Sequence, residues 1–217
     1  IQNGGEYGVD CGGTCVKLCQ SAYLPAKIAW GGGKTEKVAE SLYNVAALII
    51  NPNTNAAAMN VPYKFALFDS KGLLITERAG RVNIPAGRNT LAFEPAVDVG
   101  KRIPTKVTFE FVVPPLWFKS RDTLGGLAIT NKKYAEGEKS SALEVTIENR
   151  SLIPVKDITV GAILYDIEEN AIGFSKTNID VLAPQGKDIA PFTWPIGRKG
   201  RVVTVEALPV VTPLRIN

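Results

Sequence analysis

The chain contains no histidine among its 217 residues. Histidine is the commonest general base and the commonest transition-metal ligand in proteins. Its absence excludes a Ser-His-Asp hydrolase and leaves a cysteine nucleophile without an imidazole partner. Acidic residues such as Asp69 and Asp166 lie in predicted turns, where Asp typically accepts hydrogen bonds from backbone amides. The sequence therefore predicts a protein that is not an enzyme.

Long apolar runs and clusters of charge are also missing. No run approaches the ~18 apolar residues that a membrane-spanning helix needs, and the net charge of +4 is spread along the chain. The densest group of cations, Arg198-Lys199-Gly200-Arg201, falls in a predicted hairpin turn, where such residues usually serve only to stay in water. We therefore expect no nucleic-acid partner, and a membrane only through an anchor upstream of Ile1.

Cysteine is scarce and confined to one place. Cys11, Cys15 and Cys19 lie in a glycine-rich N-terminal stretch that cannot bury a core, so crosslinks or a bound ion must hold it. Their C-x3-C-x3-C spacing, without histidine, favours disulfides over a zinc site. The odd count then requires a partner for the third thiol, and the simplest source is a cysteine just upstream of Ile1.

The only cofactor that the residues suggest is Ca²⁺. Asn3, Glu6 and Asp10 form the most acidic group of oxygen-bearing side chains in the N-terminal stretch, and calcium takes its ligands from the oxygens of loops. These three residues are therefore candidate calcium ligands, and no other cofactor is expected.

The most informative feature present is an internal repeat. The segment Phe65-Ala66-Leu67-Phe68-Asp69 returns as Ala162-Ile163-Leu164-Tyr165-Asp166 about a domain's length later. Each copy follows an apolar run that ends in asparagine, and precedes a turn, an alternating strand, a Pro-x-Gly turn, an aromatic segment and a closing strand. The matched landmarks are Asn51 and Asn149, 85–87 and 184–186, 93–95 and 192–195, and 107–110 and 203–206. The pattern predicts a duplicated β module.

The strand pattern predicts an all-β fold with two tandem β-sandwiches. Short alternating strands between turns are typical of sandwiches rather than of parallel sheets with helices, and a module of about 100 residues can bury its own core. The strand expected at 43–50 is apolar at most positions, which indicates that both its faces are covered. We place a Cys/Gly-rich, disulfide-stapled leader at 1–22, the first sandwich at 23–117 and the second at 118–217.

The segment between the modules is stiff and apolar. Pro114-Pro115-Leu116-Trp117-Phe118 is expected to pack against a module and to restrict the angle between the two. Trp117 and Phe118 are the candidates for contact with another chain. Residues 30–35 end in Gly-Lys-Thr, but Ile28 stands where a phosphate-binding loop needs glycine, so this segment is predicted to be a turn or linker.

Two resemblances add to this interpretation. Residues 1–15 are similar to the Ile-Gln-Asn-Gly-x-Glu-x-Gly-Val-Asp-Cys-Gly-Gly-x-Cys element of many exported and surface-anchored proteins, often bacterial, which implies an extracytoplasmic location. The repeated segments 65–69 and 162–166 resemble the Phe-x-Leu-Tyr-Asp signature of FxLYD domains, with Phe68 in place of tyrosine and Ala162 in place of phenylalanine. FxLYD domains are small immunoglobulin-like sandwiches of bacterial envelope proteins, so the resemblance implies that fold and no catalytic residues.

These observations predict a non-enzymatic structural or interaction protein of a bacterial cell envelope, located at the cell surface, in the periplasm or outside the cell. It would act as a spacer, an adhesin or a surface-assembly subunit. Its partners would be other envelope proteins or further copies of the chain, which unpaired strand edges can recruit. The alternative is a glycan- or lipid-binding module that uses the cleft between the sandwiches. Exposed tryptophans beside a groove would favour this alternative, and buried tryptophans would count against it.

Overall fold

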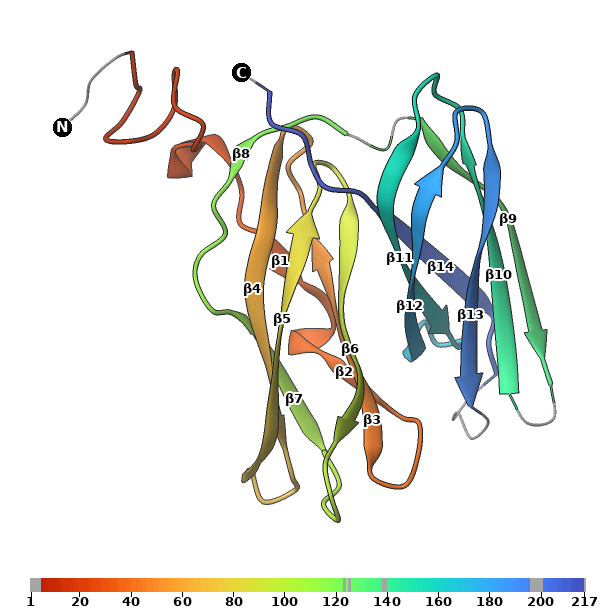
Figure 1. Ribbon diagram of the computed structural model, residues 1–217. Helices are drawn as coiled ribbons and strands as arrows, with labels where there is room; N and C mark the ends of the chain where they lie inside the picture. Colours follow the sequence, from red (N-terminus) through yellow and green to blue (C-terminus); the bar gives the residue numbers. More distant parts are fainter. Residues whose placement is uncertain (1–4, 123, 125, 138–139, 196–200, 217) are drawn as a thin grey trace.

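The computed structural model describes residues 5–122, 124, 126–137, 140–195 and 201–216. Within these residues the chain forms strands β1 to β14 and two 3₁₀ turns, η1 (Gln20–Ala22) and η2 (Ala29–Gly32), and has no α-helix. No helix in this part of the chain is long and apolar enough to cross a bilayer. The strands form two sandwiches behind a disulfide-bonded leader (Figure 1), so the predicted fold class is confirmed.

The first sandwich has two sheets, each with a long central strand. In one sheet β3 (Leu42–Ile50) pairs with β6 (Asn89–Asp98) on one side and with the short β1 (Lys27–Ile28) and β2 (Lys34–Lys37) on the other. In the other sheet β4 (Ala56–Phe68) lies between β5 (Leu74–Ile84) and β7 (Lys106–Phe111). The short β8 (Phe118–Lys119) pairs with the start of β4, so this sheet extends into the linker.

The second sandwich has the same strand order. Its sheets are β13-β10-β9 and β12-β11-β14, all antiparallel. The strands are β9 (Leu127–Glu136), β10 (Ser140–Asn149), β11 (Val155–Tyr165), β12 (Ala171–Leu182), β13 (Lys187–Pro195) and β14 (Thr204–Val210). Strands β3 to β7 therefore correspond to β10 to β14, and the repeated segments lie at the ends of the two matching strands β4 and β11.

The structure corrects one detail of the repeat. Ala92 pairs with Ala47 in the first sandwich, and Ala190 pairs with Val145 in the second. Phe93 and Phe192, which the sequence places in register, therefore lie one residue apart in the matched strands. Because successive residues of a strand face opposite sides, Phe192 points into its core and Phe93 points out of its sandwich.

Each sandwich encloses its own core. In β10 the residues at alternate positions, Leu143, Val145 and Ile147, are fully buried in the second core. The first core is built in the same way from β3, β4 and β6, with Phe65 and Leu67 of the repeated segment at its centre. The alternating pattern thus determines which face of each strand is buried.

A buried asparagine closes the same corner of each sandwich. The Asn51 side-chain amide donates to the carbonyls of Ala56 and Pro85, at 2.8 and 2.7 Å. The Asn149 amide donates to the carbonyls of Ile153, Leu182 and Ala183, at 2.8, 3.2 and 3.0 Å. Each amide therefore ties the end of its strand to the Pro-x-Gly turn, which explains why both apolar runs end in asparagine.

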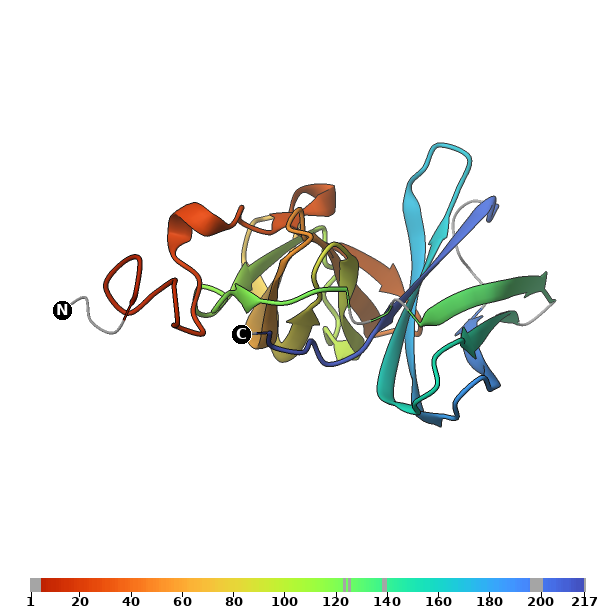
Figure 2. The same cartoon turned by 90° about the horizontal axis from the view of Figure 1, so that it is seen from above.

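The two sandwiches pack face to face through a third apolar cluster, which we call the interface cluster. It contains Ala46, Leu48, Leu91 and Phe93 from the first sandwich and Ile163, Ala171 and Phe174 from the second. Seen from above, the β12-β11-β14 sheet stands between the first sandwich and the other sheet of the second (Figure 2). The prediction that the strand at 43–50 is covered on both faces is confirmed, because its outward side chains are buried in this cluster.

Polar and steric contacts fix the two sandwiches against each other. A carboxylate oxygen of Glu36 in β2 accepts a hydrogen bond from the backbone N–H of Phe174 at 3.1 Å. The Trp30 ring of turn η2 packs on the Phe174 ring with the centroids 5.4 Å apart. A Cβ atom at Gly161 would lie only 2.9 Å from the Cβ of Leu91, so the close approach of the sandwiches requires glycine there.

Candidate functional site

The leader is held by one disulfide. Cys11 and Cys19 are bonded, and Cys15 is a free, partly exposed thiol. The Cys15 thiol donates to Glu6 at 3.0 Å, and this hydrogen bond, with partial desolvation and the nearby acidic charge, raises the pKa of Cys15. A raised pKa disfavours the thiolate, so Cys15 is poorly suited to be a nucleophile.

The calcium candidates are only partly described. Asn3 lies outside the described residues, while Glu6 accepts hydrogen bonds from the Cys15 thiol and from the backbone N–H of Asp10, at 3.0 and 3.2 Å. Glu6 thus holds the leader loop together. In the described part of the chain, no three or more acidic, cysteine or histidine side chains are grouped to hold a metal ion.

The linker aromatics are not exposed, which corrects the expectation of a contact surface there. Trp117 is 3 % and Phe118 is 2 % exposed. Trp117 belongs to the first core and packs on Tyr23, whereas Phe118 packs against Ala57 and Ala86, and the Arg215 guanidinium lies 5.2 Å from its ring centroid. These side chains fix the linker to the first sandwich, because a stiff apolar segment gains more by packing than by reaching into water.

Several carboxylates of the two sandwiches have structural partners. Glu94 accepts a hydrogen bond from the Tyr63 hydroxyl at 2.8 Å, and Asp98 accepts one from the backbone of Gly100 at 2.8 Å. Asp166 accepts two backbone N–H groups of its own hairpin, at 2.9 Å each. The prediction that Asp69 and Asp166 bond turn amides is confirmed for both.

Two hollows lie along the boundary between the sandwiches in the described part of the chain. One of about 330 Å³ lies between Arg88, Leu127 and Pro209, and one of about 120 Å³ lies near Arg81, Asp157 and Lys176. Trp117 and Trp194 are buried in the two cores, and Trp30 packs in the interface cluster. No tryptophan therefore flanks these hollows as a platform for a sugar ring.

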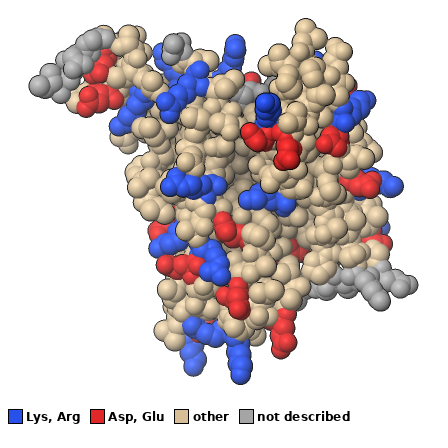
Figure 3. Space-filling model, viewed as in Figure 1, with Lys and Arg blue, Asp and Glu red and all other residues tan. Residues whose placement is uncertain are grey.

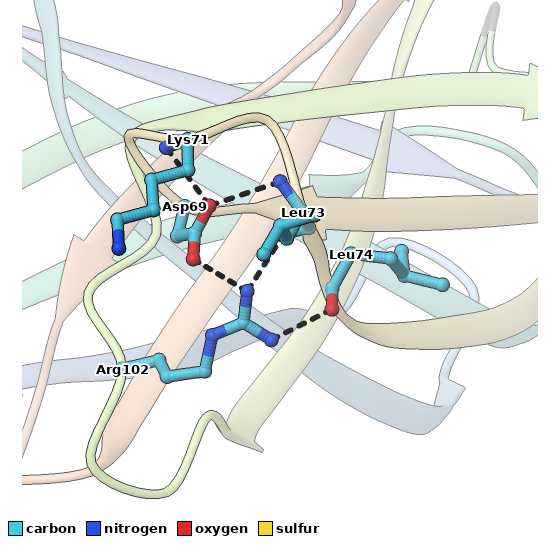
Figure 4. Close-up of polar contacts among 5 residues, drawn as sticks. All are labelled: Asp69, Lys71, Leu73, Leu74 and Arg102. Carbon is cyan, nitrogen blue, oxygen red and sulfur yellow. Dashed lines mark hydrogen bonds and ion pairs between the residues drawn. The ribbon is translucent and has the colours of Figure 1, made fainter.

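The most organised polar cluster at the surface joins two loops of the first sandwich. The Asp69 carboxylate accepts the backbone N–H groups of Lys71 and Leu73 at 2.9 Å each, which shapes the β4–β5 hairpin. From the β6–β7 loop, Arg102 bonds the same carboxylate at 2.5 Å and donates to the carbonyls of Leu73 and Leu74 at 3.0 and 2.7 Å (Figure 4). We call these residues the Arg102 clamp.

The clamp sets both the charge and the shape of this end of the molecule. The hydrogen bond from Arg102, together with the backbone N–H of Leu73, holds the pKa of Asp69 below its usual range, so the ion pair persists at neutral pH. Thr105 donates its backbone N–H to Phe68 at 2.9 Å and joins the loops again at the strand ends. The two loops therefore form one fixed unit, which we call the tip (residues 69–74 and 99–106).

A hollow of about 580 Å³ lies beside the tip. It is lined by residues of the β2–β3 and β6–β7 loops, among them Lys37, Glu40, Asp98 and Lys101. Both signs of charge are present, and the backbone N–H of Val99 donates to the carbonyl of the lining residue Ser41 at 2.9 Å. The hollow belongs to the same loop cluster as the clamp.

The sequence did not identify the interface cluster or the clamp. Phe93 and Phe174 belong to strands that the alternating pattern predicted. Each is a large apolar residue at a position where alternation expects an outward-facing side chain, and this is the signal that could have indicated a packing face. Arg102 and Asp69 are 33 residues apart and carry no local signal that links them. Residues 198–200 of the predicted basic turn lie outside the described residues.

Comparisons with known proteins give no family. No protein-family model matches the chain, and no curated protein matches it. Similar solved structures are a transglutaminase of red sea bream, a β-glucuronidase from glycoside hydrolase family 2, and a protein described as a β-galactosidase from Bacteroides fragilis. Their TM-scores are 0.27, 0.25 and 0.23, and their sequence identities are 15 %, 12 % and 13 %.

These structures are much longer than the chain. They match 83 %, 84 % and 82 % of it, while the chain spans 28 %, 25 % and 34 % of their lengths. At such TM-scores the similarity carries no argument about function, which has to be argued from the residues themselves.

Proposed function

We propose that the protein is a non-enzymatic, extracytoplasmic structural protein of a bacterial cell envelope, and that it acts as a rigid spacer. The observation that carries this proposal is the interface cluster. It buries large side chains from both sandwiches, such as Phe93 and Phe174, so the two sandwiches form one block. A spacer needs a fixed distance between its ends, and a block of two packed sandwiches provides it.

The leader and the chain ends support the same interpretation. The Cys11–Cys19 disulfide is typical of an oxidising compartment outside the cytoplasm. The resemblance of residues 1–15 to leaders of exported proteins, and of the repeats to FxLYD domains, agrees with an envelope location. Both ends of the described chain lie at one end of the molecule, and the tip lies at the other (Figure 1).

The edge strands favour a spacer over a self-assembling subunit. Strand β9 exposes Lys132 and Lys133, and strand β5 exposes Arg78 and Arg81. Cationic side chains on an edge strand disfavour pairing with another copy. The cleft alternative has less support, because no tryptophan lines the two hollows and all three tryptophans pack in the cores or against the interface cluster.

Denaturant unfolding observed separately in each sandwich tests the proposal. Trp117 reports on the first core and Trp194 on the second, so variants that keep one of them and replace the other tryptophans by phenylalanine give independent signals. The proposal predicts coincident transitions in both variants, because the interface cluster couples the sandwiches. Two separate transitions would indicate a hinged pair and would contradict a rigid spacer.

A further inference from the structure

Three aliphatic side chains are exposed together on the tip. Leu73 is 58 %, Leu74 is 48 % and Ile103 is 69 % exposed. The first two belong to the β4–β5 hairpin and its following strand, and the third to the β6–β7 loop that the Arg102 clamp joins to the hairpin. Figure 1 shows these loops projecting beyond the second sandwich at the same end of the molecule. The tip therefore projects at this end of the molecule, and on one side of it Ile103 lines the hollow of about 580 Å³.

The clamp keeps these side chains from collapsing onto the sandwich. Arg102 donates to the carbonyl groups of both leucines, which fixes the backbone from which their side chains extend. A segment that already has its bound conformation loses little further conformational entropy when it binds. The exposed leucines and Ile103 are thus preorganised for insertion into an apolar phase.

The same end of the first sandwich carries exposed lysines. Lys71, Lys101 and Lys106 are exposed, and no ion pair among the described residues engages their ammonium groups. The loops and adjoining strand ends here carry five cations, Lys37, Lys71, Lys101, Arg102 and Lys106, against three acids, Glu40, Asp69 and Asp98. The excess is two positive charges, and Figure 3 shows residues of both signs at the lower end of the first sandwich.

The second sandwich provides an internal comparison. Its matching hairpin exposes Ile167 at 83 %, but the neighbouring residues are Glu168 and Glu169. Among the described residues, the Asp166 carboxylate there accepts hydrogen bonds from the backbone and side-chain amides of Asn170. Among the described residues of the two hairpins, the exposed aliphatic side chain of the second sandwich therefore lies next to acids in the sequence, whereas Leu73 and Leu74 follow Lys71.

We propose that the tip docks on an anionic lipid bilayer. Leu73, Leu74 and Ile103 would enter the boundary between headgroups and acyl chains, and the lysines would contact the anionic headgroups. This partner differs from the expectation that only an upstream anchor brings the chain to a membrane. The proposal rests on the spacer function, to which it adds the surface that the far end of the spacer contacts.

Co-sedimentation with vesicles tests the proposal on the full chain. The probes are vesicles of phosphatidylcholine alone and vesicles of two parts phosphatidylcholine to one part anionic phosphatidylglycerol. The wild type is expected to bind the anionic vesicles and not the neutral ones. Lys71→Ser and Lys101→Ser should each weaken binding about fivefold, which corresponds to ~1 kcal/mol per lysine near such a surface. Leu73→Ser combined with Leu74→Ser should weaken it more than about tenfold.

The matched control is a second exposed aliphatic pair. Leu152 and Ile153 are 81 % and 68 % exposed in the β10–β11 loop, at the opposite end from the tip. Replacing both by serine should leave vesicle binding unchanged. All these positions are exposed, so an unchanged melting temperature and circular dichroism spectrum separate loss of binding from loss of folding.

Three results would overturn the proposal. The first is no binding of the wild type to anionic vesicles, and the second is equal binding to neutral ones. The third is binding to soluble polyphosphate that depends on the lysines while the leucine variant binds normally, which would identify a polyanion rather than a bilayer as the partner. None of these results changes the coincidence of the unfolding transitions, so failure here is distinguishable from failure of the spacer function.

Discussion

The outward faces of the two matching sheets, β5-β4-β7 and β12-β11-β14, differ at three corresponding positions. In the first sandwich these positions hold Lys64, Glu77 and Glu110, and the lysine lies 2.9 and 3.3 Å from the two carboxylates. In the second sandwich the strand pairing places Gly161, Phe174 and Leu208 there. Three changes thus convert a solvated face into a packing face, while the strand order stays the same.

The other pair of outward faces differs in the opposite sense. The β3 and β6 strands present Ala46, Leu48, Leu91 and Phe93 to the second sandwich, and the corresponding residues of β10 and β13 are Glu144, Thr146, Ile189 and Pro191. The apolar face of one sandwich therefore meets the apolar face of the other, and the two outer faces are mostly polar. Among the described residues, the contact between the sandwiches therefore uses the more apolar outward face of each.

Removing Phe174 should break this pairing. Phe174→Ala deletes a fully buried ring from the interface cluster, and we expect it to cost about 3 to 5 kcal/mol and to separate the unfolding transitions of the two sandwiches. The matched control is Glu77→Ala at the corresponding position of the first sandwich, where an exposed ion pair contributes at most about 1 kcal/mol. Denaturant unfolding measures the loss of unfolding free energy in each variant. Similar losses in both would contradict the claim that one face is a packing face and the other a solvated face.

The buried asparagines should behave alike. Asn51→Ala and Asn149→Ala each remove a buried amide and leave backbone carbonyls without a donor, and we expect each to cost about 2 kcal/mol. Chemical denaturation of the two variants provides the measurement. A large loss in one sandwich and none in the other would mean that the matching corners are not equivalent.

The hairpins should respond differently to loss of an arginine. Arg102→Met removes the largest cause of the depressed pKa of Asp69, so an NMR titration should show that pKa rising toward the ordinary value of about 4 while that of Asp166 stays unchanged. In the wild type the clamp is fully present above the ordinary aspartate pKa and is lost as the pH falls through the depressed value. A pKa of Asp69 that does not move in the variant would contradict the clamp.

Reduction of the disulfide should have the smallest effect. Cys11 and Cys19 crosslink only the leader, which contacts the first sandwich through Leu18 and its hydrogen bond to Trp117. A reducing agent should therefore increase hydrogen exchange in the leader and leave the main unfolding transition in place. A lower midpoint of the main unfolding transition after reduction would show that the leader stabilises the sandwiches.

Local patterns predicted the sandwiches well. The alternating pattern predicted which residues of β10 and β4 face inward. The asparagine at the end of each apolar run indicated the corner where a buried amide bonds the backbone of the Pro-x-Gly turn. The strand at 43–50 was recognised as covered on both faces. These features could be predicted because each depends on residues that are close in sequence.

Features that depend on distant residues could not be predicted. Phe93 faces outward because of the register in which β6 pairs with β3. The sequence repeat alone aligned Phe93 with Phe192, which is one residue away from this register. The linker was expected to pack against a module, but Trp117 and Phe118 were also candidates for contact with another chain, because the sequence does not show which linker side chains the fold buries. The pairing of Cys11 with Cys19, and of Arg102 with Asp69, likewise depends on how the chain folds back on itself.

The distance between spin labels on the two sandwiches tests the central claim most directly. Labels at Arg78→Cys in β5 and Lys133→Cys in β9, in a Cys15→Ser background that removes the free thiol, sit on exposed strand positions. Pulsed electron paramagnetic resonance should give one narrow distance distribution in this chain and a broad one when Phe174→Ala is added. A broad distribution without Phe174→Ala would contradict the claim that the two sandwiches form a single rigid block.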